Sequence, residues 1–395
     1  MSHPLRRALP VLVLLGLSAC GPSAGMDAGP DAVDAGRGDA GVDGGVDAGL
    51  PRLPDGGVAP LVIPRQLSDL HLFKAVPIVD GQVQPEDDVI PYEMATPLFS
   101  DYALKTRSVR IPEGAATWSR DEVLDFPVGT ILTKTFSFPA DFREPSKNVR
   151  AVETRLLVRQ PTGWEAYPYV WNAEQTEATF APGGRVMDVS FIDADGGAVT
   201  TQYLVPSKNQ CQECHHVKGE DSEQHLLPIG PKARYLNFET TVKGVKQNQL
   251  ERFAALGKLT GLPQLSERPK AIDAFDAAHG SLEERARTYL DINCAHCHRP
   301  EGTAGETSQL FLDYGNVDRF RLGECKRPGS AGSDVGGEFD IVPGDHTQSI
   351  LWFRLQTTES GKMMPLIGRA LSHQEGAHLV AEWIDSLPPK DCRAP

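Results

Sequence analysis

Residues 289–298 read Tyr-Leu-Asp-Ile-Asn-Cys-Ala-His-Cys-His, and this stretch determines how the rest of the chain is interpreted. Its last five residues contain Cys294, Cys297 and His298 in the pattern Cys-x-x-Cys-His, which attaches a c-type haem. Two thiols at this spacing reach the two vinyl groups of one porphyrin, and the following imidazole binds the iron. The stretch therefore predicts one covalently bound haem with His298 as the proximal ligand.

The same pattern occurs earlier in the chain, at Cys211, Cys214 and His215. A zinc ribbon places its two Cys pairs about 15 to 20 residues apart, whereas Cys214 and Cys294 are separated by a much longer segment. A thioredoxin-like redox pair lies in a βαβ context and has no use for a following His. The sequence therefore predicts two haem c groups, the first of them with His215 as its proximal ligand.

Residues 1–20 are typical of a lipoprotein signal peptide. Two Arg residues precede an apolar run over residues 9–17, and Leu-Ser-Ala-Cys-Gly follows, with Cys20 as the residue that would carry the lipid. Gly21 in the next position resembles the sorting signal for an outer membrane. We expect a cell-envelope lipoprotein, anchored to the outer membrane and facing the periplasm or the cell surface, where c-type haem attachment also takes place.

Residues 21–60 consist almost entirely of Gly, Ala, Asp, Val and Pro. Such a segment cannot bury enough apolar surface to offset its chain entropy, so it predicts a disordered tether. The formal net charge of the chain is −14, which argues against nucleic acid or an anionic membrane surface as a partner. We expect redox proteins as partners and contact with the membrane through the N-terminal lipid anchor only.

The remainder predicts an α+β protein of several domains. Residues 61–205 form the first of them, a β domain, because short runs rich in Val, Thr, Phe and Tyr alternate there with turn signals. The expected strands cover residues 107–111, 130–138, 149–160, 164–171, 184–192 and 199–205. Apolar residues alternate with Arg155 and Arg159, which predicts one buried and one solvated face. We expect an antiparallel sandwich or a barrel-like sheet with a structural role.

Mainly helical, cytochrome c-like segments are expected after residue 205. Residues 206–278 carry the first haem motif and a short helical pattern over 248–256, with Gly257 as its C-cap. Residues 279–395 carry the second haem motif. Two capping boxes predict helices in this last domain, and they are formed by Ser281 with Glu284 and by Ser372 with Glu375.

A methionine pair lies between these two helices, in the sequence Lys-Met-Met-Pro. Met364, directly before Pro365, is the residue we expect to bind the second iron opposite His298, since Met and His form a common c-type pair. Met363 is the less favoured alternative, and either Met can instead be core filler. A helix, a haem motif, a Met loop and a C-terminal helix together resemble a class I cytochrome c.

The sequence does not decide which residue is the sixth ligand of the first haem. His216 is next to the proximal His215 and faces the wrong way, which leaves His225, His279, Met94 and Met187 as candidates. An unoccupied sixth position is an equal alternative, and catalysis would take place there.

Two Cys remain after lipidation and haem attachment are assigned, namely Cys325 and Cys392. Leftover thiols in an oxidising compartment usually pair, so a disulfide is expected between them. Two free thiols are the alternative.

Several motifs together resemble a family of bacterial di-haem c-type cytochromes that has no assigned reaction. They are residues 97–103 (Pro-Leu-Phe-Ser-Asp-Tyr-Ala), 153–155, 169–172, both haem motifs, 341–345 and 364–369. The resemblance implies His215 and His298 as proximal ligands and Met364 as a distal ligand. Two function classes follow: an electron-transfer protein, or a haem enzyme, for instance peroxidase-like, that uses an open first haem. The first is favoured because no acid–base cluster is evident beside the first motif.

Overall fold

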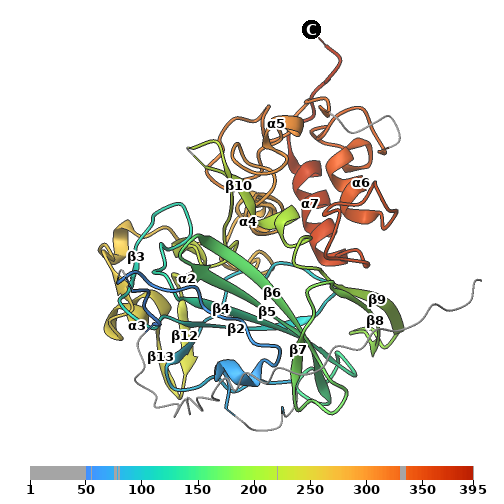
Figure 1. Cartoon of the computed structure of the whole chain (residues 1–395). Coiled ribbons are helices and arrows are strands. Elements are labelled where there is room, and N and C mark those ends of the chain that lie inside the picture. The colour runs from blue at the N-terminus through green and yellow to red at the C-terminus, as the bar shows by residue number, and fades with distance from the viewer. Residues whose placement is uncertain are drawn as a thin grey trace, which may run out of the picture. The chain divides into compact units, whose positions relative to one another are not determined.

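A six-stranded antiparallel sheet is the largest element of the structure, a computed structural model that describes residues 50–54, 56–74, 78, 81–219, 221–329 and 335–394 (Figure 1). The strand order is β1-β2-β4-β5-β6-β7. The strands are β1 (Val89–Pro91), β2 (Leu104–Arg110), β4 (Ile131–Pro139), β5 (Val149–Gln160), β6 (Gly163–Trp171) and β7 (Ala178–Phe180). The predicted antiparallel β-rich half is therefore confirmed, with an open sheet in place of a closed barrel.

The β-branched and aromatic residues of the central strands explain their length and register. β5 covers 12 residues and pairs with both β4 and β6, and its Leu156 and Val158 are fully buried on one face. A separate hairpin of β8 (Arg185–Ile192) and β9 (Ala198–Val205) packs on the other face. Phe138 of β4 and Phe191 of β8 stack there with ring centroids 5.8 Å apart. A small hairpin thus takes the place of the second sheet of a sandwich.

Short elements precede the sheet, interrupt its strand sequence or follow it before the C-terminal part. They are η1 (Ser68–Leu70), β3 (Ala116–Thr117), α1 (Gln212–His215), β10 (His216–Lys218), β11 (Gln224–Leu226), α2 (Ala233–Leu236), β12 (Glu239–Val242), β13 (Val245–Asn248), α3 (Gln249–Ala255), β14 (Leu259–Thr260) and η2 (Leu265–Glu267). Gly257 follows the end of α3 at φ +67°, as the sequence predicts, and the side chain of Asn248 caps the start of this helix.

The C-terminal part contains α4 (Leu282–Cys294), α5 (Gly305–Ser308), η3 (His346–Gln348), α6 (Ile350–Gln356) and α7 (Gln374–Ser386). The predicted capping box of Ser281 and Glu284 starts α4. The one predicted for α7 is wrong, because His373 is the N-cap residue and the Glu375 carboxylate accepts from the Tyr102 hydroxyl at 3.0 Å. α4 packs against α7 around Trp383, which is fully buried.

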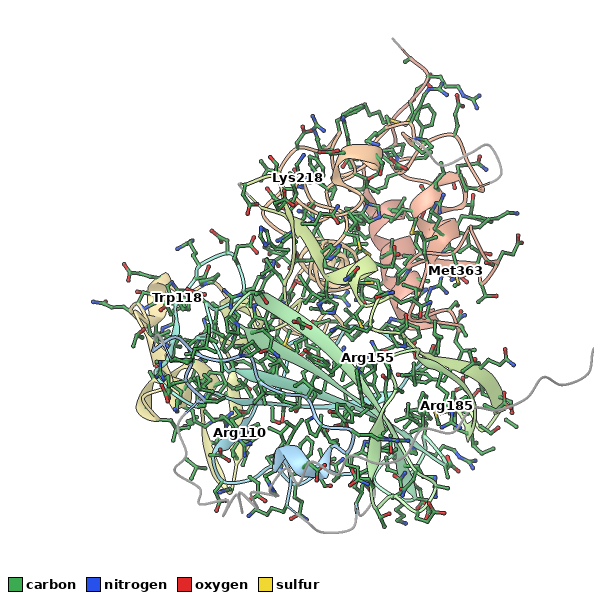
Figure 2. The ribbon with its side chains drawn as sticks, in the orientation of Figure 1. Arg110, Trp118, Arg155, Arg185, Lys218 and Met363 are labelled. Atoms are coloured by element: carbon green, nitrogen blue, oxygen red, sulfur yellow. A yellow bond between two sulfur atoms is a disulfide. The ribbon has the colours of Figure 1, made fainter. Side chains whose placement is uncertain are left out.

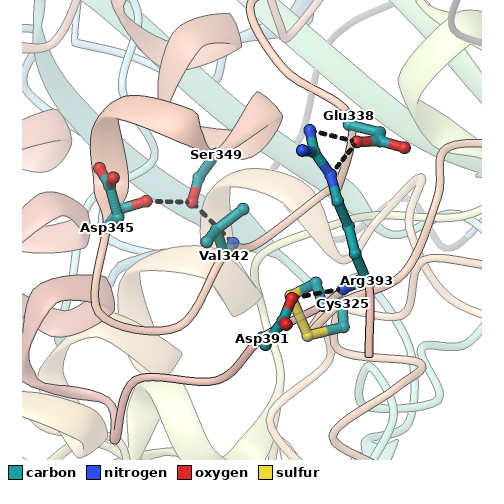
Figure 3. The surroundings of a disulfide bond; sticks show 8 residues. Cys325, Glu338, Val342, Asp345, Ser349, Asp391 and Arg393 are labelled. Carbon is teal, nitrogen blue, oxygen red and sulfur yellow. Dashed lines mark hydrogen bonds and ion pairs between the residues drawn. A yellow bond between two sulfur atoms is a disulfide. The ribbon is translucent and has the colours of Figure 1, made fainter. Parts of the chain in front are cut away.

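A disulfide closes the C-terminal part and confirms the predicted pairing of Cys325 with Cys392 (Figure 3). Arg393 beside it forms an ion pair with Glu338 at 2.8 Å. The bond joins residues 67 positions apart, so it removes a large loop-closure entropy from the unfolded chain, about 4 kcal/mol in the chain-entropy model.

The expected signal peptide, Cys20 and the tether up to residue 49 lie outside the described residues. Contacts with the β half begin before residue 61, because Arg52 forms an ion pair with Glu113, in the loop between β2 and β3, at 2.8 Å. The described residues belong to one compact unit. None of the described helices has the length and apolar character needed to cross a membrane.

Candidate functional site

The first Cys-x-x-Cys-His motif is placed by a turn that leaves β9. Cys211 precedes α1, and its backbone N–H donates to the Ser207 carbonyl at 3.1 Å. His215 ends α1, and its Nδ1 lies 2.7 Å from the Leu227 carbonyl oxygen. Because a carbonyl only accepts, Nδ1 carries the proton and the lone pair of Nε2 is free for a metal. Burial lowers the pKa of His215 to about 4, so the imidazole is neutral.

The second motif lies at the C-terminal end of α4, whose apolar stripe runs directly into Cys294. His298 follows one turn later, and its Nδ1 lies 3.3 Å from the Ser308 hydroxyl oxygen. That hydroxyl donates to the Ala304 carbonyl at 2.8 Å, which leaves its oxygen to accept from His298. Burial lowers the pKa of His298 as well. Both histidines of the motifs are therefore oriented with Nε2 available.

The structure brings the two motifs together, which the sequence did not predict. The ligand atoms of Cys214, His296 and Cys297 all lie within 4.8 Å of one another. The Thr303 hydroxyl donates to the Glu213 carbonyl at 3.3 Å, across the two motifs. Groups bound at the two motifs would therefore be neighbours.

The four motif cysteines do not converge on one point, which argues against a four-cysteine zinc site. Among the described residues, the one metal-like cluster contains Cys214, His296 and Cys297 but neither Cys211 nor Cys294. Structural zinc needs four ligands in a closed tetrahedron. The described residues therefore do not form a site of four motif cysteines.

Two cavities adjoin the motifs. The first is lined by Cys211, Cys214 and His215, and also by Met94. The second is lined by Cys294, Cys297 and His298 together with apolar side chains, which are those of Leu310, Leu312, Ile350, Leu351 and Leu355. Cys214, Cys294 and Met364 line both cavities, so the two hollows adjoin one another between the motifs.

Met364 lines the second cavity together with His298 and also lines the first cavity, whereas Met363 lines neither. The Met364 loop is held by Arg369, which is 6% exposed. Its guanidinium donates at 2.8–3.0 Å to the carbonyl oxygens of Met364, Leu371, Arg354 and Thr357. This fork fixes the loop against α6 and orders the segment that presents Met364.

The four candidates for the sixth ligand of the first haem lie in different surroundings. His225 is exposed and bound to Asp221 at 2.9 Å, and His279 is exposed and bound to Asp276 at 2.6 Å. Met187 packs on the β8–β9 hairpin. Met94 is the only one of the four that lines the first cavity.

His373 also lines this cavity, and no sequence pattern pointed to it. Its ring stacks on Phe99 at 4.2 Å, and its Nδ1 lies 3.1 Å from the Tyr289 hydroxyl. Burial lowers the pKa of His373 to about 4. A neutral aromatic wall therefore closes this side of the cavity.

The sheet supplies the opposite wall, and the predicted solvated face of β5 is wrong at this point. Arg155 lines the first cavity with Lys134 and Arg107 in place of facing water. Figure 2 shows Arg155 on the side of the sheet toward the C-terminal helices, whereas Arg110 lies away from them. The alternation along β5 is as expected, but the face assigned to solvent is covered by the rest of the chain.

Comparison of the chain with models of protein families, with curated proteins and with solved structures finds no match.

Proposed function

We propose that the chain is a di-haem c-type cytochrome of the cell envelope that transfers electrons. The observation that supports this most is that two histidines have the same surroundings and the same ring orientation. His215 and His298 each follow a Cys-x-x-Cys pair, each has Nδ1 beside an oxygen acceptor, and each adjoins a cavity. A fixed Nδ1–H orients a metal-binding imidazole and increases its basicity.

The side chains at the two motifs suit covalently bound haem. The thiols of Cys211 and Cys214 would hold the first haem and those of Cys294 and Cys297 the second, each through two thioethers. Bound haem supplies a one-electron ferric–ferrous couple. The apolar side chains of the second cavity would surround the bound group on one side, and Glu213, Asp340 and Arg354 also line this cavity. Met364 would bind the second iron opposite His298, and α4, the Met loop and α7 would then correspond to a class I cytochrome c.

We propose that Met94 would bind the iron of the first haem, because it lines the first cavity with His215 and, unlike Met364, does not line the second. Two haems ligated on both sides have no open position for a substrate. The contact between Cys214 and Cys297 would also place the two groups close enough for electron exchange. Both features favour electron transfer over catalysis.

The second candidate is a peroxidase-like enzyme with an open first haem. His373 in the wall of the first cavity is the one observation that favours it, since a neutral imidazole can accept a proton from a bound substrate. In that case Met94 would not bind the iron.

Location and partners complete the proposal. The signal-like N-terminus and Cys20 favour a lipid anchor in the outer membrane, with the folded part facing the periplasm or the cell surface. Redox proteins are the partners that such a carrier requires.

A spectrum of the purified protein with and without carbon monoxide, cyanide and peroxide tests the choice between the two functions. We expect two low-spin haems whose spectra none of the three additions changes. A haem that binds carbon monoxide and reacts with peroxide would contradict the electron-transfer proposal and support the enzyme.

A further inference from the structure

Three cations form a row across the central strands of the sheet. Arg107 of β2 is the register partner of Lys134 of β4, and Lys134 is the register partner of Arg155 of β5. Directly paired residues project from the same face of an antiparallel sheet. All three side chains accordingly line the first cavity.

The charges of this row are not balanced by the protein. Arg155 forms a fork with Glu153, through Nε to Oε2 at 2.8 Å and Nη2 to Oε1 at 2.5 Å. Within the described part of the chain, Arg107 and Lys134 form no ion pair. The Lys134 ammonium lies instead over the ring of Phe136, 4.7 Å from its centroid.

The surrounding charged groups do not correct this imbalance. Lys105 projects from the same face of β2 and donates to the Ala103 carbonyl at 2.7 Å, and burial lowers its pKa to about 7. Glu93 acts on Arg107 only through charge at longer range. The Asp101 carboxylate accepts from two backbone N–H groups. Burial is the main cause that lowers the pKa of Lys134, and the charge of Arg107 is the second cause.

Like charges opposite one another weaken a sheet, and a partly buried charge without a partner also lowers stability. A chain of net charge −14 nevertheless concentrates cations at this wall. Such a wall is expected where an anion binds.

The next row on the same face is apolar. Leu132 pairs with Leu157, and Leu157 pairs with Ala166. These three residues line the same cavity. The wall is therefore amphiphilic, with an apolar strip beside a cationic strip. It is suited to a flat apolar molecule that carries acidic groups along one edge.

We propose that Arg107, Lys134 and Arg155 form a dicarboxylate site that holds the two propionates of the haem attached at Cys211 and Cys214. This inference rests on the proposed function. The charge of Arg155 reaches both Cys211 and Cys214, so the row lies close to the first motif. The β half of the chain, for which the sequence suggests a structural role, becomes one wall of the first haem site.

The row has a consequence for the electron affinity of that haem. Cations beside the propionates keep them ionised, and cations near an iron disfavour its ferric form. Removing one cation is expected to favour the ferric form by about tenfold, which is a fall of about 59 mV for one electron.

Lys134→Met tests the site in full-length protein matured with haem, through the potential of each haem measured across pH. We expect one haem to lose about 59 mV at neutral pH and the other to remain unchanged. A propionate without its cation also has a raised pKa. The potential of that haem should therefore rise as pH falls between about pH 7 and 4, while the wild type stays flat.

Lys134→Arg and Arg110→Gln are the matched controls. The first keeps the charge in the row. The second removes a cation from β2, the strand of Arg107, but Arg110 pairs with Asp88 at 2.7 Å and does not line the cavity. Both should follow the wild-type profile. Arg107→Gln replaces Lys134→Met as the test if the latter does not fold.

A pH profile of Lys134→Met that matches the wild type and both controls overturns the dicarboxylate site. The intact mass of the same samples separates this outcome from failure of the proposed function. Two haem additions with an unchanged profile overturn the site alone, whereas the absence of haem in the wild type overturns both proposals. Infrared redox difference spectra with isotope-labelled propionates must also show a carboxylate change in Lys134→Met.

Discussion

Replacement of Asp101 should loosen the connection between the β half and the Met364 loop. Its Oδ1 accepts from the backbone N–H of Ala370 at 2.7 Å and from that of Leu371 at 2.8 Å. Asp101 is 1% exposed and has φ +49°, a left-handed conformation. One carboxylate oxygen thus joins residues about 270 positions apart, at the end of the loop that carries Met364.

The expected loss follows from these contacts. In Asp101→Ala, two partly buried N–H groups lose their acceptor, at about 1–2 kcal/mol each. The left-handed backbone costs Ala about 1 kcal/mol more than it costs Asp or Asn. The free energy of unfolding should therefore fall by about 3–5 kcal/mol, a large part of the 5–15 kcal/mol typical of a folded domain.

Asp101→Asn is the matched control, because its amide oxygen accepts both N–H groups and Asn tolerates a left-handed conformation. We expect it to lie within about 1 kcal/mol of the wild type. Urea unfolding followed by tryptophan fluorescence measures all three proteins. Equal midpoints for Asp101→Ala and Asp101→Asn would show that the two hydrogen bonds do not hold the loop.

Three further predictions concern ligands and covalent bonds. Met364→Ala should lower the potential of one haem by at least about 59 mV in a redox titration, with a much smaller effect for Met363→Ala; equal effects would refute the assignment. Replacing Cys325 and Cys392 by Ser should lower the free energy of unfolding by about 4 kcal/mol in denaturant, and a loss below about 1 kcal/mol would contradict the loop-closure argument. Met94→Ala should let one haem bind carbon monoxide; an unchanged spectrum would mean that Met94 is not a ligand.

Local sequence patterns were sufficient to predict the strand and the helix that lead to the site. The 12 residues of β5 follow β-branched alternation, and α4 follows a capping box and an apolar stripe. Both signals lie within one turn or one strand, so they do not depend on distant parts of the chain. The same holds for Gly257 at the end of α3.

Contacts between distant segments could not be predicted in this way. The Ser372 cap fails because Tyr102, far away in sequence, binds Glu375. The cation row depends on strand register and on which face the C-terminal part covers. In the sequence of one strand, Arg155 simply alternates with apolar residues. That pattern also predicts a face that is exposed to solvent. The approach of Cys214 to Cys297 likewise has no local signal.

The number of covalently bound haems tests the central claim most directly. Intact mass should be measured on the chain produced with c-type assembly factors, together with two double variants, Cys211→Ser with Cys214→Ser and Cys294→Ser with Cys297→Ser. We predict two haem additions in the wild type and one in each variant. A wild type with a single haem, with a zinc ion in place of haem, or with no addition would contradict the assignment of both motifs as haem sites.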